Sequence, residues 1–248
     1  MRGSVPLALI IGMAAIACAQ SPHWEYRGRF GPANWGRLDP ANKACSDGSE
    51  QSPINIHHAH LNKALKPLEF HFIASPVTLE NDGYMIAVHS TSGSYMVMDG
   101  ERYQLQKVDF HRPSETAVNG NLADMSLGML FRNSGGKMVM VVVRMNADQD
   151  FPNATLSTLW QHLPAAAGTS QQITDVMVNP GGLLPANRGY WTYMGSLTTP
   201  PCTEGVRWFV MEQVLSISRQ QLRAFTSLFE MNSRPLQDAH GRRIEANE

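Results

Sequence analysis

The sequence has no excess of charge of either sign, with 20 Lys and Arg residues against 21 Asp and Glu and a formal net charge of -1 at pH 7. Proteins that bind nucleic acid normally have a basic face or a high pI, so we expect no nucleic-acid partner. Blocks of like charge are absent too, which argues against a charged interaction tail. No internal repeat, low-complexity run or Pro/Ser-rich linker divides the chain. Its 248 residues suffice for one large domain with a full core, which we place at residues 20–248.

Long apolar runs are missing except near the N-terminus. The stretch from Val5 to Ala17 is apolar, follows a basic residue and is too short to cross a bilayer comfortably. A small-residue cleavage site follows, so we expect residues 1–19 to be a signal peptide and Gln20 to begin the mature chain. The protein is then exported, periplasmic or secreted, with no membrane span. A lipoprotein anchor on Cys18 is the alternative.

Cysteine is scarce, and removal of residues 1–19 would leave only Cys45 and Cys202. An even number of cysteines in an exported protein suggests one disulfide. Such a bridge would close a loop of roughly 157 residues and contribute on the order of 5 kcal/mol in the chain-entropy model. Two buried free thiols are the alternative.

Short apolar or alternating runs, separated by turn residues, dominate the chain after Pro67. They predict strands at residues 68–72, 77–80, 84–89, 95–98, 103–111, 122–132 and 137–145. Asp99-Gly100 predicts a hairpin turn before the fifth of these strands, and residues 134–136 predict another before the last.

Helices are few in the predicted pattern. Residues 156–163 fit two helical turns, and residues 218–229 place Leu222, Phe225 and Phe229 on one face behind a Ser cap. Residues 23–67 are rich in Gly, Pro, Asn and His and predict irregular wrapping loops. The fold class is therefore mainly β (α+β), a single domain built on a large sheet.

Three blocks hold the chemical information: Gln51 to Ile56, Lys107 to Glu115, and Gly195 to Cys202. Together they resemble the α-class carbonic anhydrases, in particular the exported bacterial type. Further matches at residues 23–26, 31–35, 118–120, 190–191, 208 and 232–237 extend the resemblance over nearly the whole mature chain. The resemblance implies a central, mainly antiparallel, twisted sheet of about ten strands. It also implies that Cys45 pairs with Cys202.

The metal positions depart from that family. Its members hold zinc with a His-x-His pair on one strand and a third His on the next, and these positions here are Asp109, His111 and Gly128. Residues two apart on a strand share a face, so Lys107 joins Asp109 and His111 where the family has Gln. Ser126 replaces the glutamate that orients a ligand. At most two protein ligands remain where zinc uses three or four, so we expect no metal cofactor.

Other parts of the pocket match the family. Thr198 matches the hydroxyl beside the zinc-bound hydroxide, and Glu115 matches the carboxylate that orients that hydroxyl. Leu130, Leu197 and Trp208 match the apolar wall of the pocket. The same residues also have a purely structural explanation, because they tie a loop to the sheet or fill the core. Tyr84 stands near the place of the family's proton-shuttle His, and a phenol with a pKa near 10 is a poor shuttle at neutral pH.

The loss of a buried dication would leave carboxylates uncompensated, which is unfavourable. We therefore expect the Lys107 ammonium to pair with Asp109, with His111 or Glu115 adjacent; the alternative is that Lys107 reaches out to water.

Three functions compete. The first is a non-catalytic exported protein that binds an unknown ligand or partner. The second is a zinc-dependent lyase that hydrates carbon dioxide through a rebuilt site, with a ligand from a loop such as that of His57, His58 and His60. The third is an anion site in a cleft that Gly128 and Ser126 enlarge opposite Lys107. The sequence leaves open whether the chain is a monomer or a dimer.

Overall fold

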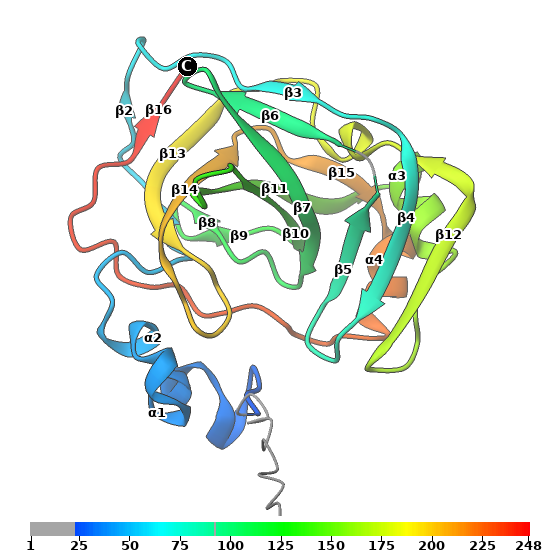
Figure 1. Ribbon diagram of the computed structural model, residues 1–248, viewed down its shortest axis with the longest axis horizontal. Helices are drawn as coiled ribbons and strands as arrows, with labels where there is room; N and C mark the ends of the chain where they lie inside the picture. Colours follow the sequence, from blue (N-terminus) through cyan, green and yellow to red (C-terminus); the bar gives the residue numbers. More distant parts are fainter. Residues whose placement is uncertain (1–22, 92) are drawn as a thin grey trace, which may run out of the picture.

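The computed structural model describes residues 23–91 and 93–248 and centres on one large twisted sheet (Figure 1). Within these residues the sheet has 13 strands, more than the roughly ten expected from the family. The main path runs β12-β4-β5-β7-β10-β11-β14-β13-β16-β2, and β3, β6 and β15 pair beside it. The predicted signal peptide, including Cys18, lies outside the described residues. No helix in the described part of the chain is long and apolar enough to cross a membrane.

The strands of the large sheet are mostly short. They are β2 (His60–Leu61), β3 (Glu69–His71), β4 (Ser75–Asn81), β5 (Ile86–Ser90), β6 (Tyr95–Met98), β7 (Glu101–His111), β10 (Met125–Arg132), β11 (Met138–Gln149), β12 (Thr169–Val178), β13 (Tyr190–Ser196), β14 (Glu204–Met211), β15 (Leu215–Ser218) and β16 (Glu245–Ala246). A separate small sheet contains β1 (Asn55–Ile56), β8 (Ala117–Val118) and β9 (Asn121–Leu122). The sequence pattern predicted that Leu122 begins the long strand. This is wrong: Leu122 belongs to the small sheet, and the long strand β10 begins at Met125.

The helices are also short. They are α1 (Trp35–Leu38), α2 (Ala44–Asp47), α3 (Ala154–Trp160) and α4 (Arg219–Thr226), with 3-10 turns η1 (Gly28–Phe30), η2 (Pro32–Asn34), η3 (Pro40–Asn42) and η4 (Pro180–Leu183). The predicted Ser cap of α4 is confirmed: Ser218 and Gln221 form a reciprocal capping box, which satisfies backbone donors at the helix start. Phe225 on this helix is fully buried.

Both predicted hairpin turns are confirmed. Asp99 and Gly100 have φ values of 52° and 78°, the left-handed pair that a two-residue turn between β6 and β7 requires. Strands β10 and β11 pair antiparallel, with Gly136 at φ 84° in the turn between them.

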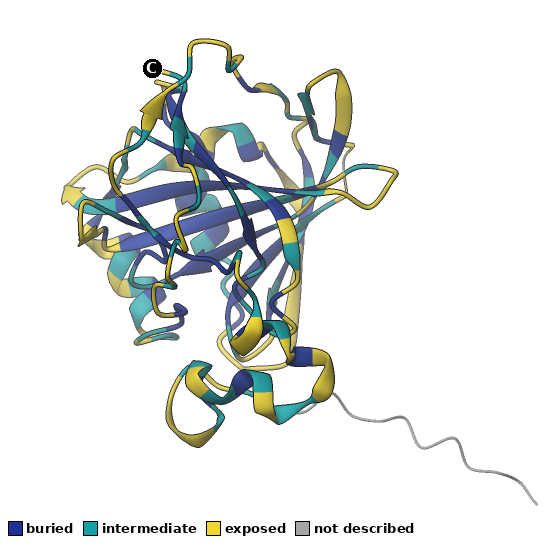
Figure 2. Ribbon diagram, turned by 90° about the vertical axis from the view of Figure 1, so that its left-hand side faces the viewer, coloured by how far each residue is buried: buried dark blue, intermediate teal, exposed yellow. Residues whose placement is uncertain are grey.

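The two faces of the sheet bury different clusters. One face packs Phe110, Phe131 and Phe209 with residues of α3 and α4. The other face packs Met140, Val142 and Trp208. Because alternate residues of β7, β10 and β11 face opposite ways, both faces are apolar and the strands are dark in Figure 2, where burial is coloured. The second face holds the candidate site.

A disulfide joins the N-terminal segment to the body. Cys45 at the start of α2 is bonded to Cys202, with sulfur atoms 2.08 Å apart, so the predicted pairing is confirmed. Trp35 packs with these two cysteines. In Figure 1, α1 and α2 lie at the lower edge of the molecule, away from the sheet.

Candidate functional site

Strands β7 and β10 place the candidate residues opposite each other. His111 pairs with Ser126, Asp109 with Gly128, and Lys107 with Leu130. Asp109, His111 and Ser126 are buried, with exposed fractions of 6%, 5% and 2%. The alternation of β7 therefore brings its three polar side chains to one face, as the sequence predicted.

Lys107 and Asp109 form an ion pair. The Lys107 Nζ lies 3.0 Å from Asp109 Oδ2, so the predicted pairing is confirmed. The lysine side chain keeps 32% of its surface exposed and the aspartate side chain only 8%, so the pair bridges the surface and the interior. The other carboxylate oxygen, Asp109 Oδ1, is buried and has no hydrogen-bond partner within the described residues.

His111 is held from both sides. Its Nδ1 lies 2.9 Å from the backbone carbonyl of Asn232, and because a carbonyl only accepts, Nδ1 is the protonated nitrogen. Its Nε2 then faces Glu115, with Oε2 3.7 Å away. The imidazole of His111 is thus oriented toward a carboxylate of its own chain.

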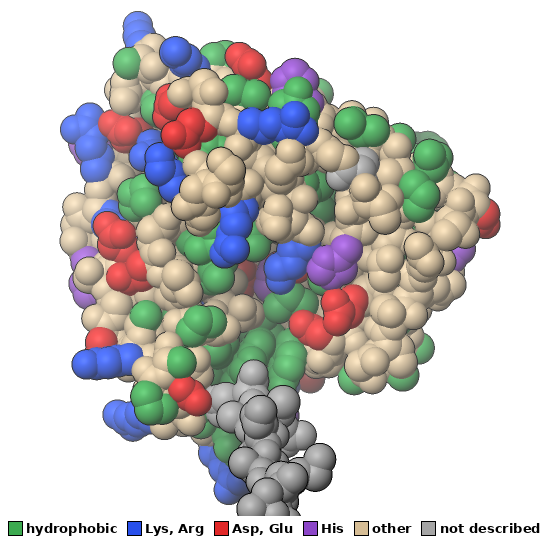
Figure 3. Space-filling view, in the orientation of Figure 1, with side chains coloured by type: hydrophobic (Ala, Val, Ile, Leu, Met, Phe, Trp, Pro, Cys, Tyr) green, Lys and Arg blue, Asp and Glu red, His purple; other side chains and the backbone are tan. Residues whose placement is uncertain are grey.

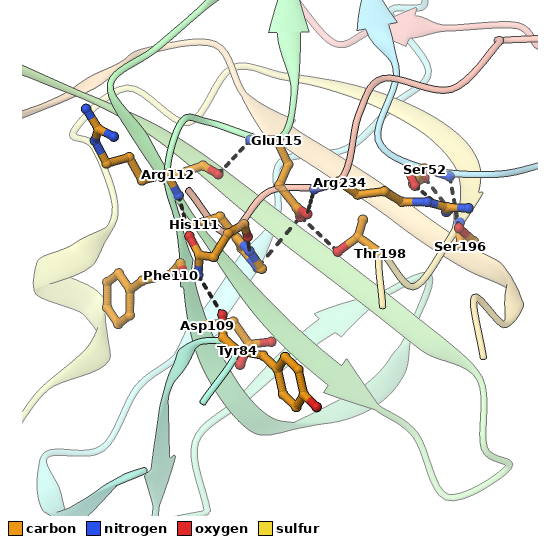
Figure 4. A network of polar contacts seen from close by, with 12 residues as sticks. Ser52, Tyr84, Asp109, Phe110, His111, Arg112, Glu115, Ser196, Thr198 and Arg234 are labelled. Atoms are coloured by element: carbon orange, nitrogen blue, oxygen red, sulfur yellow. Dashed lines mark hydrogen bonds and ion pairs between the residues drawn. The ribbon is translucent and has the colours of Figure 1, made fainter. Parts of the chain in front are cut away.

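Glu115 is the centre of the polar network in Figure 4. Its Oε2 accepts a hydrogen bond from Thr198 Oγ1 at 2.8 Å, and its Oε1 accepts one from the backbone N–H of Arg234 at 3.2 Å. Its own N–H donates to Ser126 Oγ at 3.2 Å. Burial raises the pKa of Glu115, although neighbouring His111 and the hydrogen bonds from Arg234 and Thr198 act in the opposite direction. The Thr198–Glu115 pair that the family resemblance predicted is therefore formed.

The space at Gly128 is filled. A Cβ added to Gly128 would lie 2.9 Å from Met140 Sδ, because the methionine of the neighbouring strand β11 occupies the position. The remaining cavity, lined among others by Asp109, His111 and Thr198, has a volume of about 20 Å³. That volume holds about one water molecule. The expected enlargement of the cleft by Gly128 and Ser126 is therefore wrong.

The other predicted pocket residues lie around this cavity. Trp208 lines it and donates from Nε1 to the Ser196 carbonyl at 2.9 Å, while Leu130 and Leu197 pack against the same apolar cluster. Tyr84 does not line the cavity. It stacks on Trp24 with ring centroids 4.0 Å apart.

The Tyr84 side chain and the loop histidines do not line the cavity, although the Tyr84 carbonyl accepts a hydrogen bond from Asn232 Nδ2 at 3.1 Å. The Tyr84 hydroxyl lies 3.2 Å from His23 Nδ1, and burial raises the pKa of the phenol. His57, His58 and His60 join no metal-type cluster, because the described residues contain no group of three or more His, Cys, Asp or Glu placed to hold a metal ion.

Three residues of the site were not predicted from the sequence. They are Met140, which fills the space at Gly128, and Asn232 and Arg234, which hold His111 and Glu115. The Arg234 guanidinium also donates to Gln51 Oε1 and the Ser52 carbonyl, both at 2.8 Å. The block at residues 232–237 was a sequence match to the family and could have directed attention to Asn232 and Arg234. Nothing in the apolar run of β11 distinguishes Met140.

Comparisons with known proteins agree with this architecture. Residues 30–248 match the family model described as eukaryotic-type carbonic anhydrase. A carbonic anhydrase of Klebsiella pneumoniae is 38% identical over 247 residues, which cover 98% of this chain and 98% of that protein.

Solved structures agree as well. The α-carbonic anhydrase from Thermovibrio ammonificans, in complex with the inhibitor sulfanilamide, matches with a TM-score of 0.87 at 33% identity, covering 91% of this chain and 100% of that chain. Dioscorin in complex with ascorbate matches with a TM-score of 0.83 at 27% identity, covering 90% of this chain and 97% of that chain.

Proposed function

Because the chain belongs to the α-carbonic anhydrase family, we propose that it is an exported member that holds no catalytic zinc and acts as a binding or scaffold protein. The observation that supports this most is the ion pair between Lys107 and Asp109, with Nζ and Oδ2 3.0 Å apart. This ion pair occupies one carboxylate oxygen of Asp109, the residue that the family resemblance places at the first ligand position.

The donor set does not fit a zinc ion of the family's kind. Catalytic zinc sites use three protein ligands and leave one position open. Here the first position is a carboxylate paired with an ammonium, the second is His111, and the third is Gly128, whose place Met140 fills. A dication placed beside Asp109 would also be repelled by the Lys107 charge.

Thr198 and Glu115 have a role without a metal. They join the loop after β13 to the segment after β7, and Glu115 also accepts from Arg234. All three are buried, with exposed fractions of 7%, 5% and 2%. A folded, non-catalytic relative would need the same contacts, so their retention is compatible with the proposal.

A ligand-binding role is the positive part of the proposal. Dioscorin, which shares this fold, was solved in complex with ascorbate. In the present chain the cavity beside His111 measures about 20 Å³, too small for an organic molecule. We therefore place ligand binding elsewhere on the surface.

The second candidate is zinc-dependent hydration of carbon dioxide through a rebuilt site. The intact hydrogen bond between Thr198 Oγ1 and Glu115 Oε2, at 2.8 Å, favours it. It would require Lys107 to release Asp109 and a third ligand to come from another segment.

Zinc content of the purified, metal-reconstituted mature protein, measured beside stopped-flow hydration of carbon dioxide, tests the two. We expect zinc well below one ion per chain and no rate above the uncatalysed reaction. About one zinc per chain with chelator-sensitive turnover would refute the proposal and establish the second candidate. Intact mass of the exported protein tests the cleavage before Gln20.

A further inference from the structure

A much larger cavity lies on the other face of the sheet. It has a volume of about 710 Å³ and lies between the β6–β7 turn, the segment before β3, and the first residues of β11 and β14. Its floor is made by Tyr103, Tyr190 and Phe209, which are nearly fully buried in the cluster on this face. Trp208, next to Phe209 on β14, packs in the opposite cluster. The large cavity is therefore separated from Asp109 and His111 by the sheet.

The walls of this cavity are mixed, with an apolar part beside charged side chains. Met98, Met138 and Met194 line it and are all half-buried. Methionine side chains are flexible and polarizable, so such walls adapt to ligands of different shape. The volume falls within the range of about 300–1,000 Å³ that is typical of small-molecule sites.

Arg207 supplies a positive charge at the wall of this cavity, where it also borders a smaller hollow lined by Arg242 and Glu245. It lines the cavity from β14, and its Nε donates to Thr192 Oγ1 at 2.8 Å, which fixes the plane of the guanidinium. Within the described residues the terminal Nη groups have no hydrogen-bond acceptor, and the side chain is half-buried. A fixed guanidinium with free N–H groups matches a carboxylate, which accepts two parallel hydrogen bonds.

The acidic groups of the cavity do not cancel this charge. Glu101 is paired with Lys137, with Nζ and Oε1 3.3 Å apart, and its Oε2 accepts from the Tyr103 hydroxyl at 3.1 Å. Glu69 and Asp99 are exposed at the rim. The Tyr190 hydroxyl already donates to the Lys66 carbonyl at 2.7 Å. Two charged donors therefore remain for a ligand: the exposed Lys66, and Arg207, which is half-buried and held by its hydrogen bond to Thr192.

We propose that this cavity binds a small organic carboxylate with an apolar body. The carboxylate accepts from the Arg207 Nη groups, and the apolar body lies against the half-buried side chains of Met98, Met138 and Met194. The proposal goes beyond the absence of catalysis and does not depend on it, because zinc at Asp109 would lie on the other face of the sheet.

Isothermal titration with decanoate and with decanamide, its neutral isostere, tests the proposal on the full mature chain. We expect saturable binding of decanoate with one site per chain, and amide shifts in NMR spectra that cluster at residues 64–69, 97–103, 190–194 and 205–209. Arg207→Gln should weaken decanoate about tenfold or more, because a charge-assisted hydrogen bond is lost, and leave decanamide unchanged.

Two further variants complete the experiment. Met98→Trp narrows the cavity and should weaken both probes. Arg223→Gln removes the same charge from the exposed face of α4 and should change neither. Equal decanoate affinity in wild type and Arg207→Gln would overturn the proposal. So would the absence of saturable binding, or amide shifts confined to the Asp109 face.

Discussion

The two faces of the sheet differ in how their cavities are filled. The face with Asp109 and His111 retains only about 20 Å³ of space, whereas the opposite face has a cavity of about 710 Å³. On the first face Met140 fills the space at Gly128, and Asp109 is held in an ion pair with Lys107; these are positions that the family resemblance assigns to metal ligands. On the second face Met98 and Met194 stand at the wall of the cavity and leave it open, and Met138, which packs with the cluster of the first face, lies at its edge. The same residue type thus closes one site and lines the other, and the surrounding backbone decides which. Figure 3 shows basic and acidic side chains interspersed on the surface that faces the viewer, so charge does not mark out a binding region on that side.

The sharpest way to break this contrast is to reopen the first face. The quadruple variant Lys107→Gln, Asp109→His, Gly128→His and Met140→Leu should take up about one zinc per chain and hydrate carbon dioxide about a hundredfold or more above background, because zinc then has three imidazole ligands. Metal analysis and stopped-flow assays measure both. The matched control is the triple variant that carries the other three substitutions and keeps Met140. Because Met140 Sδ would lie 2.9 Å from a Cβ at position 128, this variant should bind zinc more weakly. Equal zinc affinity in the two variants would show that Met140 is not an obstacle.

Removal of the Lys107 ammonium should destabilise the folded protein at the first face. Lys107→Met leaves the Asp109 charge buried without its partner, and we expect a loss of about 2–3 kcal/mol in urea unfolding, below the 3–5 typical of fully buried pairs because Lys107 is partly exposed. Adding Asp109→Asn should recover much of this loss. If Lys107→Met, with Asp109 intact, were as stable as wild type, the stabilising role of the pair would be contradicted.

The pH dependence of stability should expose Glu115. Burial raises its pKa in the folded protein above the ordinary value of 4.5, so the folded state binds this proton more tightly than the unfolded state. The resulting stabilisation is present at low pH and is lost as pH rises from about 4.5 through the folded pKa. In urea unfolding from pH 4 to 8, Glu115→Gln should therefore gain stability relative to wild type as pH rises. A constant difference across this range would argue against the raised pKa.

The smallest effect is expected on the second face. Arg207→Gln should change the free energy of unfolding by about 1 kcal/mol or less, because the side chain is half-exposed and makes one hydrogen bond within the described residues, to Thr192. Chemical unfolding at neutral pH measures the change. A loss as large as that of Lys107→Met would mean that Arg207 is structural and would remove the contrast between the faces.

Local sequence patterns predicted what depends on short-range geometry. The alternation along β7 placed Lys107, Asp109 and His111 on one face, and Asp99-Gly100 marked the turn that precedes this strand. The disulfide followed from cysteine count and family resemblance. These features are set by strand period, by turn conformation or by the number of available partners.

The remainder depends on contacts that no local pattern encodes. Strand β11 is apolar on both faces, so its sequence does not say which side chain fills the space at Gly128. Asn232 reaches His111 from 121 residues away. Strands β12 to β16 were not predicted: β12 is largely polar and exposed, and β14 is buried over its last half, so neither alternates regularly.

Met140 also constrains how this chain can change over generations. A lone Gly128→His substitution would place its Cβ 2.9 Å from Met140 Sδ, so the methionine would have to move in a packed interior. The clash is with the flexible end of the methionine, so rotation of that side chain can relieve part of it; overpacking that remains typically costs about 1–3 kcal/mol. The size of residue 140 therefore limits which side chains position 128 can accept, although the two residues lie on neighbouring strands.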